Sequence, residues 1–216
     1  GTVAGMAHAL KNYGTMSLQE VMRPAYDLAL AGFPMYNYLE GSLNARKERM
    51  MKNDAAAKVF YKKDGSSYKY GETFKQKDLA WSLKRIMEGG EKEFYHGEIA
   101  ERIVADMEAN GGLITMGDMA NYKAVERPAL VGEYKGHKVV TMPPPSSGGV
   151  HLVQIMNMLE NDDLRSKGHN SAATLHLYIE AMRQAYADRS EYLGDPDFTD
   201  VPVEELTSKA YAKIIR

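Results

Sequence analysis

MPPPSSGGVH, residues 142 to 151, joins a β-rich run to an apolar helical run. The run before it, His137–Met142, has the composition of a strand, and Val150–Glu160 after it has the apolar spacing of a buried helix. The three prolines predict a rigid exit from the strand, and the two glycines allow backbones to pack closely at the start of the helix. We therefore expect a sharp strand-to-helix corner at this place.

The same loop also has features of a binding site. Ser147 is expected to cap the helix, and Gly148 and Gly149 would leave free N–H groups that favour an anion. Ser146 and Ser147 are candidates for a serine nucleophile, although they do not fit the Gly-x-Ser-x-Gly pattern. The corner is the favoured interpretation, and it predicts that valine in place of Gly148 would crowd the helix start.

The bulk composition is that of a globular protein. Of 216 residues, 44% are apolar and 26% are charged, and the net charge of −2 comes without a long basic block. Nucleic acid is therefore not an expected partner. The sequence has no cysteine, which excludes disulfides and thiolate metal sites, and no apolar run long enough to span a membrane. The opening GTVAG has no start methionine, so we expect a piece of a longer protein.

Helical patterns dominate the rest of the chain. Ser17 and Glu20 form a capping-box pattern before an apolar stripe, and Pro24 inside that stripe predicts a late start or a kink. The turn residues 64–66 predict a small hairpin or a turn between Val59–Tyr61 and Tyr68–Tyr70. Further helices are expected over residues 35–51, 74–87, 97–110, 118–122 and 171–192, and strands over 129–134 and 137–142. In the helix at 74–87, Leu79, Leu83, Ile86 and Met87 are expected to face inward.

These expectations define an α+β fold that is predominantly helical. Residues 1–125 are expected to be mainly helical, 126–160 to hold the strand pair, the Pro/Gly loop and a helix, and 161–216 to hold the long helix and a C-terminal segment. Two strands are too few for an independent sheet, so they are expected to join a sheet supplied by a larger protein. On the helix at 171–192, one stripe collects apolar residues: Leu175, Tyr178, Ile179, Met182, Ala185 and Tyr186, with Arg189 following.

Other polar clusters have structural explanations. The carboxylates between Glu191 and Glu205 fail the EF-hand spacing and are expected to follow a helix stop and an Asx/Pro turn. His176 and Glu180 are expected on a solvated helix face, because no zinc-binding pattern accompanies them. Arg183 and Arg189 are expected to pair with carboxylates such as Asp188 or Asp195. No metal site and no cofactor are predicted.

Five segments carry a family resemblance. In chain order they read GTVAG (1–5), YGTMSLQEVMRPAYDLALAGF (13–33), GGLITMGDMANYKAVERPAL (111–130), MPPPSSGGVHLVQIMNMLE (142–160) and AYADRSEYLGDPDF (185–198). Together they resemble the γ-glutamyltranspeptidase, or glutathione hydrolase, family, and its bacterial members in particular. The segments stand in the family's order and cover nearly the whole chain.

The resemblance implies more than the residues alone. The family consists of N-terminal nucleophile hydrolases with an αββα sandwich, made as a precursor (a zymogen) that cleaves itself into a large and a small subunit. The N-terminal threonine of the small subunit attacks the γ-glutamyl amide of donors such as glutathione, and water or an amine resolves the acyl-enzyme. The present chain resembles part of the large subunit. The resemblance implies the small subunit as its partner and a periplasmic or secreted location.

No catalytic residue of the family maps onto this chain, so the chain alone is expected to be inactive. The family's Thr-Thr-His junction does not occur here, and its oxyanion glycines and substrate-binding serines lie in the small subunit. Ser146, Ser147, Gly148 and Gly149 therefore remain candidates only for the wall of a substrate pocket. Two alternatives stay open: a helical scaffold or binding module without chemistry, and a serine hydrolase that uses Ser146 or Ser147.

Overall fold

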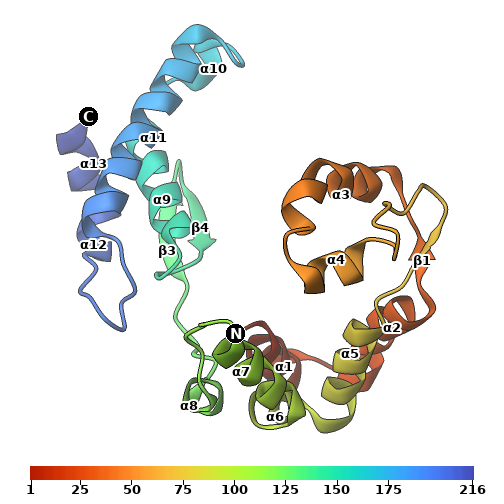
Figure 1. The fold of residues 1–216 in the computed structure, drawn as a ribbon. Coiled ribbons are helices and arrows are strands. Elements are labelled where there is room, and N and C mark those ends of the chain that lie inside the picture. The colour runs from red at the N-terminus through yellow and green to blue at the C-terminus, as the bar shows by residue number, and fades with distance from the viewer. The chain divides into compact units, whose positions relative to one another are not determined.

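The computed structural model describes residues 1–216, and the chain divides after Val125 into two units. It contains thirteen helices and four short strands, so the predicted α+β, predominantly helical fold class is confirmed (Figure 1). The first unit holds α1 (Thr2–Tyr13), α2 (Leu18–Ala31), β1 (Phe33–Pro34), α3 (Asn37–Met50), α4 (Asp54–Phe60), β2 (Thr73–Phe74), α5 (Lys77–Gly89), α6 (Glu91–His96), α7 (Glu98–Ala109) and α8 (Met116–Asn121). The second holds β3 (Leu130–Tyr134), β4 (His137–Thr141), α9 (Ser147–Leu159), α10 (Leu164–Lys167), α11 (Ala172–Tyr192), α12 (Val203–Leu206) and α13 (Lys209–Ile215).

The start of α2 is set by the predicted capping box. The hydroxyl oxygen of Ser17 accepts from the backbone N–H of Glu20 at 3.3 Å, and the Glu20 carboxylate accepts from the Ser17 N–H at 2.7 Å. The helix then runs without interruption through Pro24. The expected late start is therefore wrong. Proline removes one backbone N–H from the helix, whereas the Ser17–Glu20 box satisfies N–H groups that would otherwise lack partners in the first turn, and it fixes where the helix begins.

The predicted hairpin around residues 64–66 is reduced to one β-bridge between Tyr61 and Ser67. Val59 and Phe60 lie instead in the last turn of α4, which begins where the side chain of Asn53 accepts from the N–H of Ala56. The turn itself forms as expected, since the Asp64 carboxylate accepts from the N–H of Ser66 at 2.9 Å. The capped and alanine-rich first turns of α4 favour the helix more strongly than Val59 and Phe60 favour a strand.

Helix α5 begins later than the sequence predicts. Phe74 pairs with Phe33 in the β1–β2 ladder and is buried at the centre of an aromatic cluster, so it cannot start the helix. Leu79 was expected to point inward but is exposed, and Ala80 and Ile86 take the buried positions. Leu83 and Met87, also expected to face inward, are half-buried, so only Leu79 departs from the expected face.

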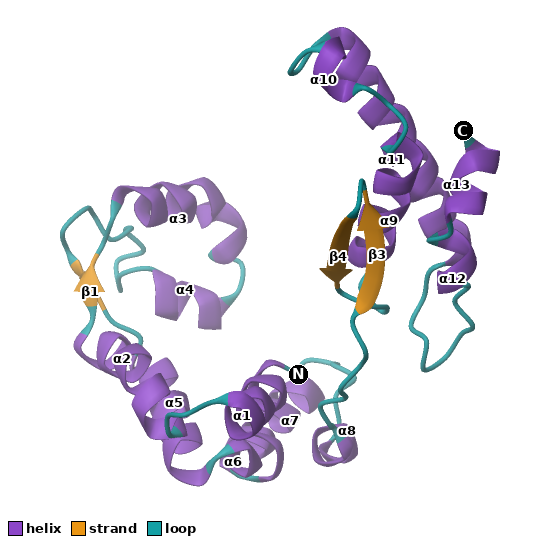
Figure 2. Ribbon diagram, turned by 180° about the vertical axis from the view of Figure 1, so that it is seen from behind, coloured by secondary structure: helices purple, strands orange, loops and turns teal.

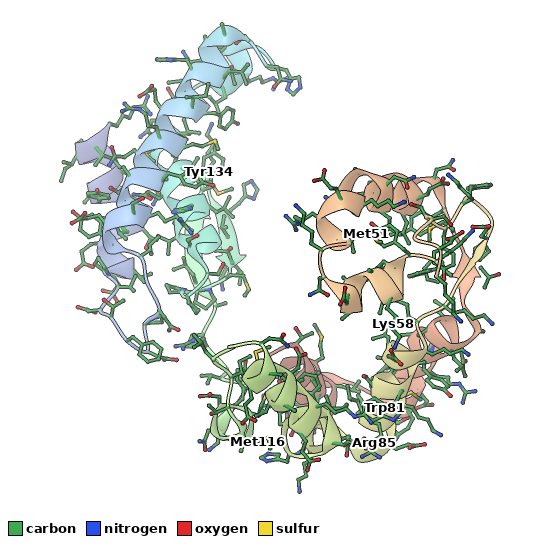
Figure 3. All side chains as sticks on the ribbon, viewed as in Figure 1. Met51, Lys58, Trp81, Arg85, Met116 and Tyr134 are labelled. Carbon is green, nitrogen blue, oxygen red and sulfur yellow. The ribbon has the colours of Figure 1, made fainter.

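Cation–π contacts and ion pairs join α5 to α6 and α7. The guanidinium groups of Arg85 and Arg102 lie 5.7 and 4.2 Å from the ring centroid of Trp81, and Trp81 and Arg85 follow each other along α5 (Figure 3). Arg85 also pairs with Glu93 of α6 at 2.7 Å and with Glu98 of α7 at 3.3 Å.

A second apolar cluster, formed by Ala4, Tyr95, Ala100, Val104 and Met119, packs α1 against α6, α7 and α8.

The second unit begins with the predicted strand pair. Strands β3 and β4 are antiparallel, and Lys135 and Gly136 connect them with positive φ angles of 48° and 78°. These angles suit a two-residue hairpin turn, whose twist matches that of the strands. Figure 2 shows the hairpin beside α9, and the packing is tight enough that a Cβ at Gly132 would lie 2.8 Å from the side chain of Val153.

Helices α9, α11 and α13 pack around one apolar cluster of Met158, Leu159, Ala181, Ala185 and Ala212. Helix α11 begins after Ser171, whose side chain caps it by accepting from the N–H of Thr174. The expected apolar stripe of α11 is present, but only its small member, Ala185, is buried. The buried apolar residues of this helix are thus its alanines, Ala181 and Ala185, with Leu177 packed against them at the edge of the cluster.

Replacing Ser17 with alanine should lower the free energy of unfolding by about 1 kcal/mol, because the change removes one half of a capping box. Urea denaturation of the two proteins measures the difference. The control is Ser82→Ala inside α5, where alanine favours the helix. Equal stability of Ser17→Ala and the wild type would show that the box does not hold this helix start.

Candidate functional site

The corner between β4 and α9 has the structure that its sequence predicts. Pro143 to Pro145 lead out of the strand, Pro144 is buried, and the peptide between Pro144 and Pro145 is cis. The helix starts at Ser147, three residues earlier than the apolar spacing indicates. The loop is therefore short, and the glycine pair belongs to the first turn of the helix.

The four candidate residues play different parts in this corner. Ser146 occupies the N-cap position, but its side chain makes no capping hydrogen bond. Ser147 is the first helical residue rather than the cap, so its expected capping role is wrong. Gly148 is exposed and Gly149 is buried. The sequence does not show which of the two glycines is tightly packed, because that depends on which atoms of the folded chain lie near each one.

Gly149 is required by a close approach of two backbones. A Cβ built at this position would lie 1.9 Å from the carbonyl oxygen of Met142 and 3.0 Å from the side chain of Thr141. At Gly148 the nearest atom would be the Ser146 hydroxyl, 3.6 Å away, which is an ordinary contact. The expectation that crowding would arise at Gly148 is therefore wrong, and the constraint lies one residue further on.

Arg189 of α11 holds the first residue of α9. Its Nε donates to the hydroxyl oxygen of Ser147 at 3.2 Å. The expected pairing of Arg189 with Asp188 or Asp195 is wrong. Arg183 pairs with a carboxylate as expected, but the partner is Glu180, three residues earlier on the same helix. The carboxylate of Asp188 accepts hydrogen bonds from three other side chains, and that of Asp195 accepts from a backbone N–H in the turn after α11. Neither carboxylate forms an ion pair with Arg183 or Arg189.

The geometry does not form a serine–histidine catalytic pair. The only hydrogen bond of the Ser147 hydroxyl is the one from Arg189, and no hydrogen bond joins Ser146 or Ser147 to His151. The Nε2 atom of His151 is buried without a hydrogen-bond partner. A serine nucleophile needs a base within hydrogen-bond reach, so this arrangement does not support one.

A buried carboxylate joins three helices beneath the corner. Asp188 of α11 accepts from the side-chain amide of Gln154 of α9, from Gln184 Nε2 at 2.9 Å and from the Tyr211 hydroxyl of α13 at 3.1 Å. Burial, together with the Asp188 hydrogen bond and charge, raises the pKa of Tyr211. The phenol therefore stays protonated and remains a donor to Asp188.

Helix α9 has a buried polar face that meets this carboxylate and that the sequence patterns above did not predict. His151, Gln154 and Asn157 recur every three residues within an otherwise apolar helix, and all three are buried. Asn157 donates to the backbone carbonyl of Thr207 at 2.7 Å. The three-residue spacing was the available signal, because it puts polar side chains on one face of a helix.

His151 lies between opposite charges. Burial and the nearby Arg189 guanidinium lower its pKa, and the Asp188 carboxylate acts in the opposite direction. Its ring centroid is 5.1 Å from that of Tyr186. The neutral imidazole is therefore the form that this environment favours.

The other polar clusters show no site for a metal. No group of three or more His, Cys, Asp or Glu residues converges in a geometry that could hold a metal ion. As predicted, Asp195 forms an Asx turn after α11, with its carboxylate accepting from the N–H of Asp197 at 3.0 Å. Asp197 in turn pairs with Arg127 at 2.7 Å. His176 and Glu180 lie on an exposed helix face, also as predicted.

Comparison with known proteins gives the class and then the family. The protein is similar to hydrolases made as proenzymes. It is 51% identical over 215 residues to the glutathione hydrolase proenzyme of Escherichia coli, a match that covers 100% of this chain and 37% of that relative. It is 42% identical to the glutathione hydrolase proenzyme of Pseudomonas sp. strain A14, where it covers 38% of the relative. The family model for γ-glutamyltranspeptidase matches residues 1–216, and the chain belongs to this family.

The solved structures agree with the sequence comparison. The chain superimposes on the γ-glutamyltranspeptidase of Helicobacter pylori with a TM-score of 0.96 and 48% identity, covering 100% of this chain and 62% of that one. The enzyme of Pseudomonas nitroreducens gives a TM-score of 0.89 at 34% identity. The predicted family resemblance is therefore confirmed, and the chain has the fold of the corresponding part of these proteins.

The chain spans little more than a third of the length of the relatives it matches in sequence. No helix is long and apolar enough to cross a bilayer.

Replacing Gly149 with alanine should destabilise the protein by at least about 1–3 kcal/mol, because the new methyl group must displace the Met142 backbone. Gly148→Ala is the matched control and should be neutral or stabilising by up to about 1 kcal/mol, since the site is open and alanine favours the helix. Thermal and urea denaturation of both variants measure the difference. Equal effects at the two glycines would contradict the close-packing account.

Acidification should weaken the fold through His151. The unfolded chain takes up a proton near the ordinary histidine pKa of about 6.5, whereas the folded chain resists it to lower pH. The contribution is therefore fully present above about pH 6.5 and is lost as the pH falls towards the lowered folded pKa. Urea denaturation at pH 7.5 and 5.5 measures it. His151→Gln should show a smaller loss of stability between these pH values than the wild type, and His176→Gln tests whether any histidine replacement does the same. An unchanged pH dependence in His151→Gln would rule out this role.

Proposed function

We propose that these residues are part of the large subunit of an enzyme that cleaves γ-glutamyl amides and transfers the γ-glutamyl group to water or an amine. The observation that carries the proposal is the match to glutathione hydrolase proenzymes over the whole chain, 51% identical to that of Escherichia coli. Glutathione is the substrate that this relative's name gives, and it is the donor that we propose for the parent protein.

We propose that the nucleophile lies outside residues 1–216. It is the N-terminal threonine of a small subunit, whose hydroxyl attacks the amide carbonyl while its own α-amine takes the proton. Backbone N–H groups stabilise the oxyanion that forms. The absence of a hydrogen bond between His151 and either serine of the corner supports this assignment.

The contribution of this chain is then structural. Helices α9, α11 and α13 hold the corner in place, and Ser146, Ser147, Gly148 and Gly149 are proposed to stand at the wall of the parent's substrate pocket. The small subunit of the same precursor is the proposed protein partner, and the periplasm or the extracellular space is the proposed location. Cell fractionation of the parent protein tests the location.

A related activity also has support. The chain is 38% identical to an acylase proenzyme of Pseudomonas sp. strain SE83 over 98% of its length. An acylase would use the same acyl-transfer chemistry on a different amide. Side-by-side assays of the parent with a γ-glutamyl anilide and with an acylase substrate separate the two, and we expect the γ-glutamyl donor to be preferred because those relatives are more similar.

Purified parent protein should turn over a γ-glutamyl anilide, whereas the 216-residue chain alone should not. In the parent, Ser146→Ala and Ser147→Ala should change kcat only a few-fold, because removing a true nucleophile typically costs a factor of about 10⁴ or more. Loss of that size in either serine variant would favour a serine hydrolase. Restored turnover on mixing this chain with the remaining segments would exclude a helical module that takes part in no enzyme. Inactivity of the parent on every donor would overturn the proposed enzyme.

A further inference from the structure

The loop between α7 and α8 begins with the only Asn-Gly pair of these 216 residues, Asn110–Gly111. Both residues are exposed, and Asn110 is the C-cap residue of α7. An asparagine side chain reacts with its own backbone when the nitrogen of the next residue reaches its Cγ atom. Glycine hinders that approach least, because it has no Cβ and tolerates most backbone angles. The pair therefore combines the most reactive sequence with access to water.

The nitrogen that would react is free in the fold. The N–H of Gly111 donates to no group of the protein, whereas that of Gly112 donates to the carbonyl oxygen of Met107 at 2.7 Å. Gly111 has a positive φ of 70°, a conformation that residues with a side chain rarely adopt. The turn thus requires a glycine after Asn110 and leaves the nitrogen of that glycine without a partner.

The one Asp-Gly pair of the chain, Asp64–Gly65, is held differently. The N–H of Gly65 donates to the carbonyl oxygen of Lys62 at 2.8 Å, and the Asp64 carboxylate accepts from the N–H of Ser66 at 2.9 Å. The nitrogen and the side chain that would have to meet are both engaged with other groups. The free nitrogen is therefore a property of the loop after α7 and not of every such turn in this chain.

We propose that Asn110–Gly111 is a site of spontaneous deamidation, at which Asn110 becomes aspartate or isoaspartate. The nitrogen of Gly111 loses its proton and bonds to Cγ of Asn110, and Nδ2 leaves as ammonia. Water then opens the resulting cyclic imide at either of its two carbonyl groups, which gives the two products. Water is the only co-reactant, so the reaction does not depend on the proposed function.

The product disturbs the end of α7, which leads into the loop to α8 (Figure 1). Nδ2 of Asn110 donates to the backbone carbonyl oxygen of Asp106 at 2.9 Å and to its carboxylate at 3.1 Å. A carboxylate at position 110 loses both hydrogen bonds and lies beside a like charge. The last turn already contains Asp106 and Glu108 and has no basic residue, and negative charge is unfavourable at a helix C-terminus. Deamidation should therefore loosen this turn.

Timed incubation of the native parent protein at mildly alkaline pH, followed by peptide mapping by mass spectrometry, tests the site. The reaction changes the peptide mass by the difference between an amide and an acid, and it releases ammonia. The matched control is Asn12, which is also exposed but precedes Tyr13. Its Nδ2 donates to the carbonyl oxygen four residues earlier at 2.9 Å, as that of Asn110 does. Asn110 should convert at least about tenfold faster than Asn12, because a side chain on the next residue hinders the attack.

Three results would overturn the site. The first is an equal rate at Asn110 and Asn12 in the native protein. The second is conversion of Asn110 only after denaturation, since the fold would then protect the pair. The third is undiminished release of ammonia from Asn110→Gln, in which the ring that must close is larger and forms more slowly.

The variant Asn110→Asp supplies the aspartate product directly and measures its effect. Hydrogen exchange of the amides in the last turn of α7 should be several-fold faster than in the wild type, because local opening becomes easier. The control is Asn12→Asp, which places a carboxylate beside Lys11 in the last turn of α1 and should leave α7 unchanged. Unchanged exchange in Asn110→Asp would contradict the expected loosening. An inactive parent in which Asn110 converts would count against the proposed enzyme and leave the deamidation site standing.

Discussion

The second unit depends on one close approach, between the carbonyl oxygen of Met142 and the backbone of Gly149. No side chain fits between them. The approach fixes where α9 begins relative to the end of β4, and everything that α9 contacts follows from that placement. Val153 can then pack against Gly132 of the hairpin, and Gln154 can reach the carboxylate of Asp188. The glycine in this loop is therefore explained by the close packing, which leaves no room for a side chain, rather than by binding of an anion.

Burying Asp188 would be unfavourable if its oxygens had no donors, because a carboxylate in an apolar interior loses its hydration. Three side chains from α9, α11 and α13 supply those donors. Hydrogen bonds of this kind are directional, so they select one arrangement of the three helices over others that would bury the same apolar area. Serines, a histidine, a glycine pair and an arginine thus lie close together in the corner and serve packing and helix placement. These residues are of the types found in catalytic sites, but they do not have the hydrogen-bonded geometry of one.

Local signals were enough to place most elements. The Ser17–Glu20 box, the Ser171 cap and the Lys135–Gly136 turn act through atoms only a few residues apart, so the sequence contains the whole interaction. Burial was predicted less well. Leu79 and the large residues of α11 were assigned by size and spacing, but which face is covered depends on helices far away in the chain. The hydrogen bond between Arg189 and Ser147 spans 42 residues, and no local pattern indicates it. The unlike surroundings of Gly148 and Gly149 have a different cause: they depend on how the loop brings the backbone of Met142 back against Gly149, which the residue types of the loop do not show.

The role proposed for this chain is to support γ-glutamyl transfer in the parent protein without supplying the nucleophile. The most direct measurement treats the parent protein with a γ-glutamyl-like electrophile that forms a stable adduct, and then locates the adduct by peptide mass spectrometry. The account predicts a single modified threonine outside residues 1–216, and no label on the peptide that contains Ser146 and Ser147. An adduct on either of those serines would contradict it.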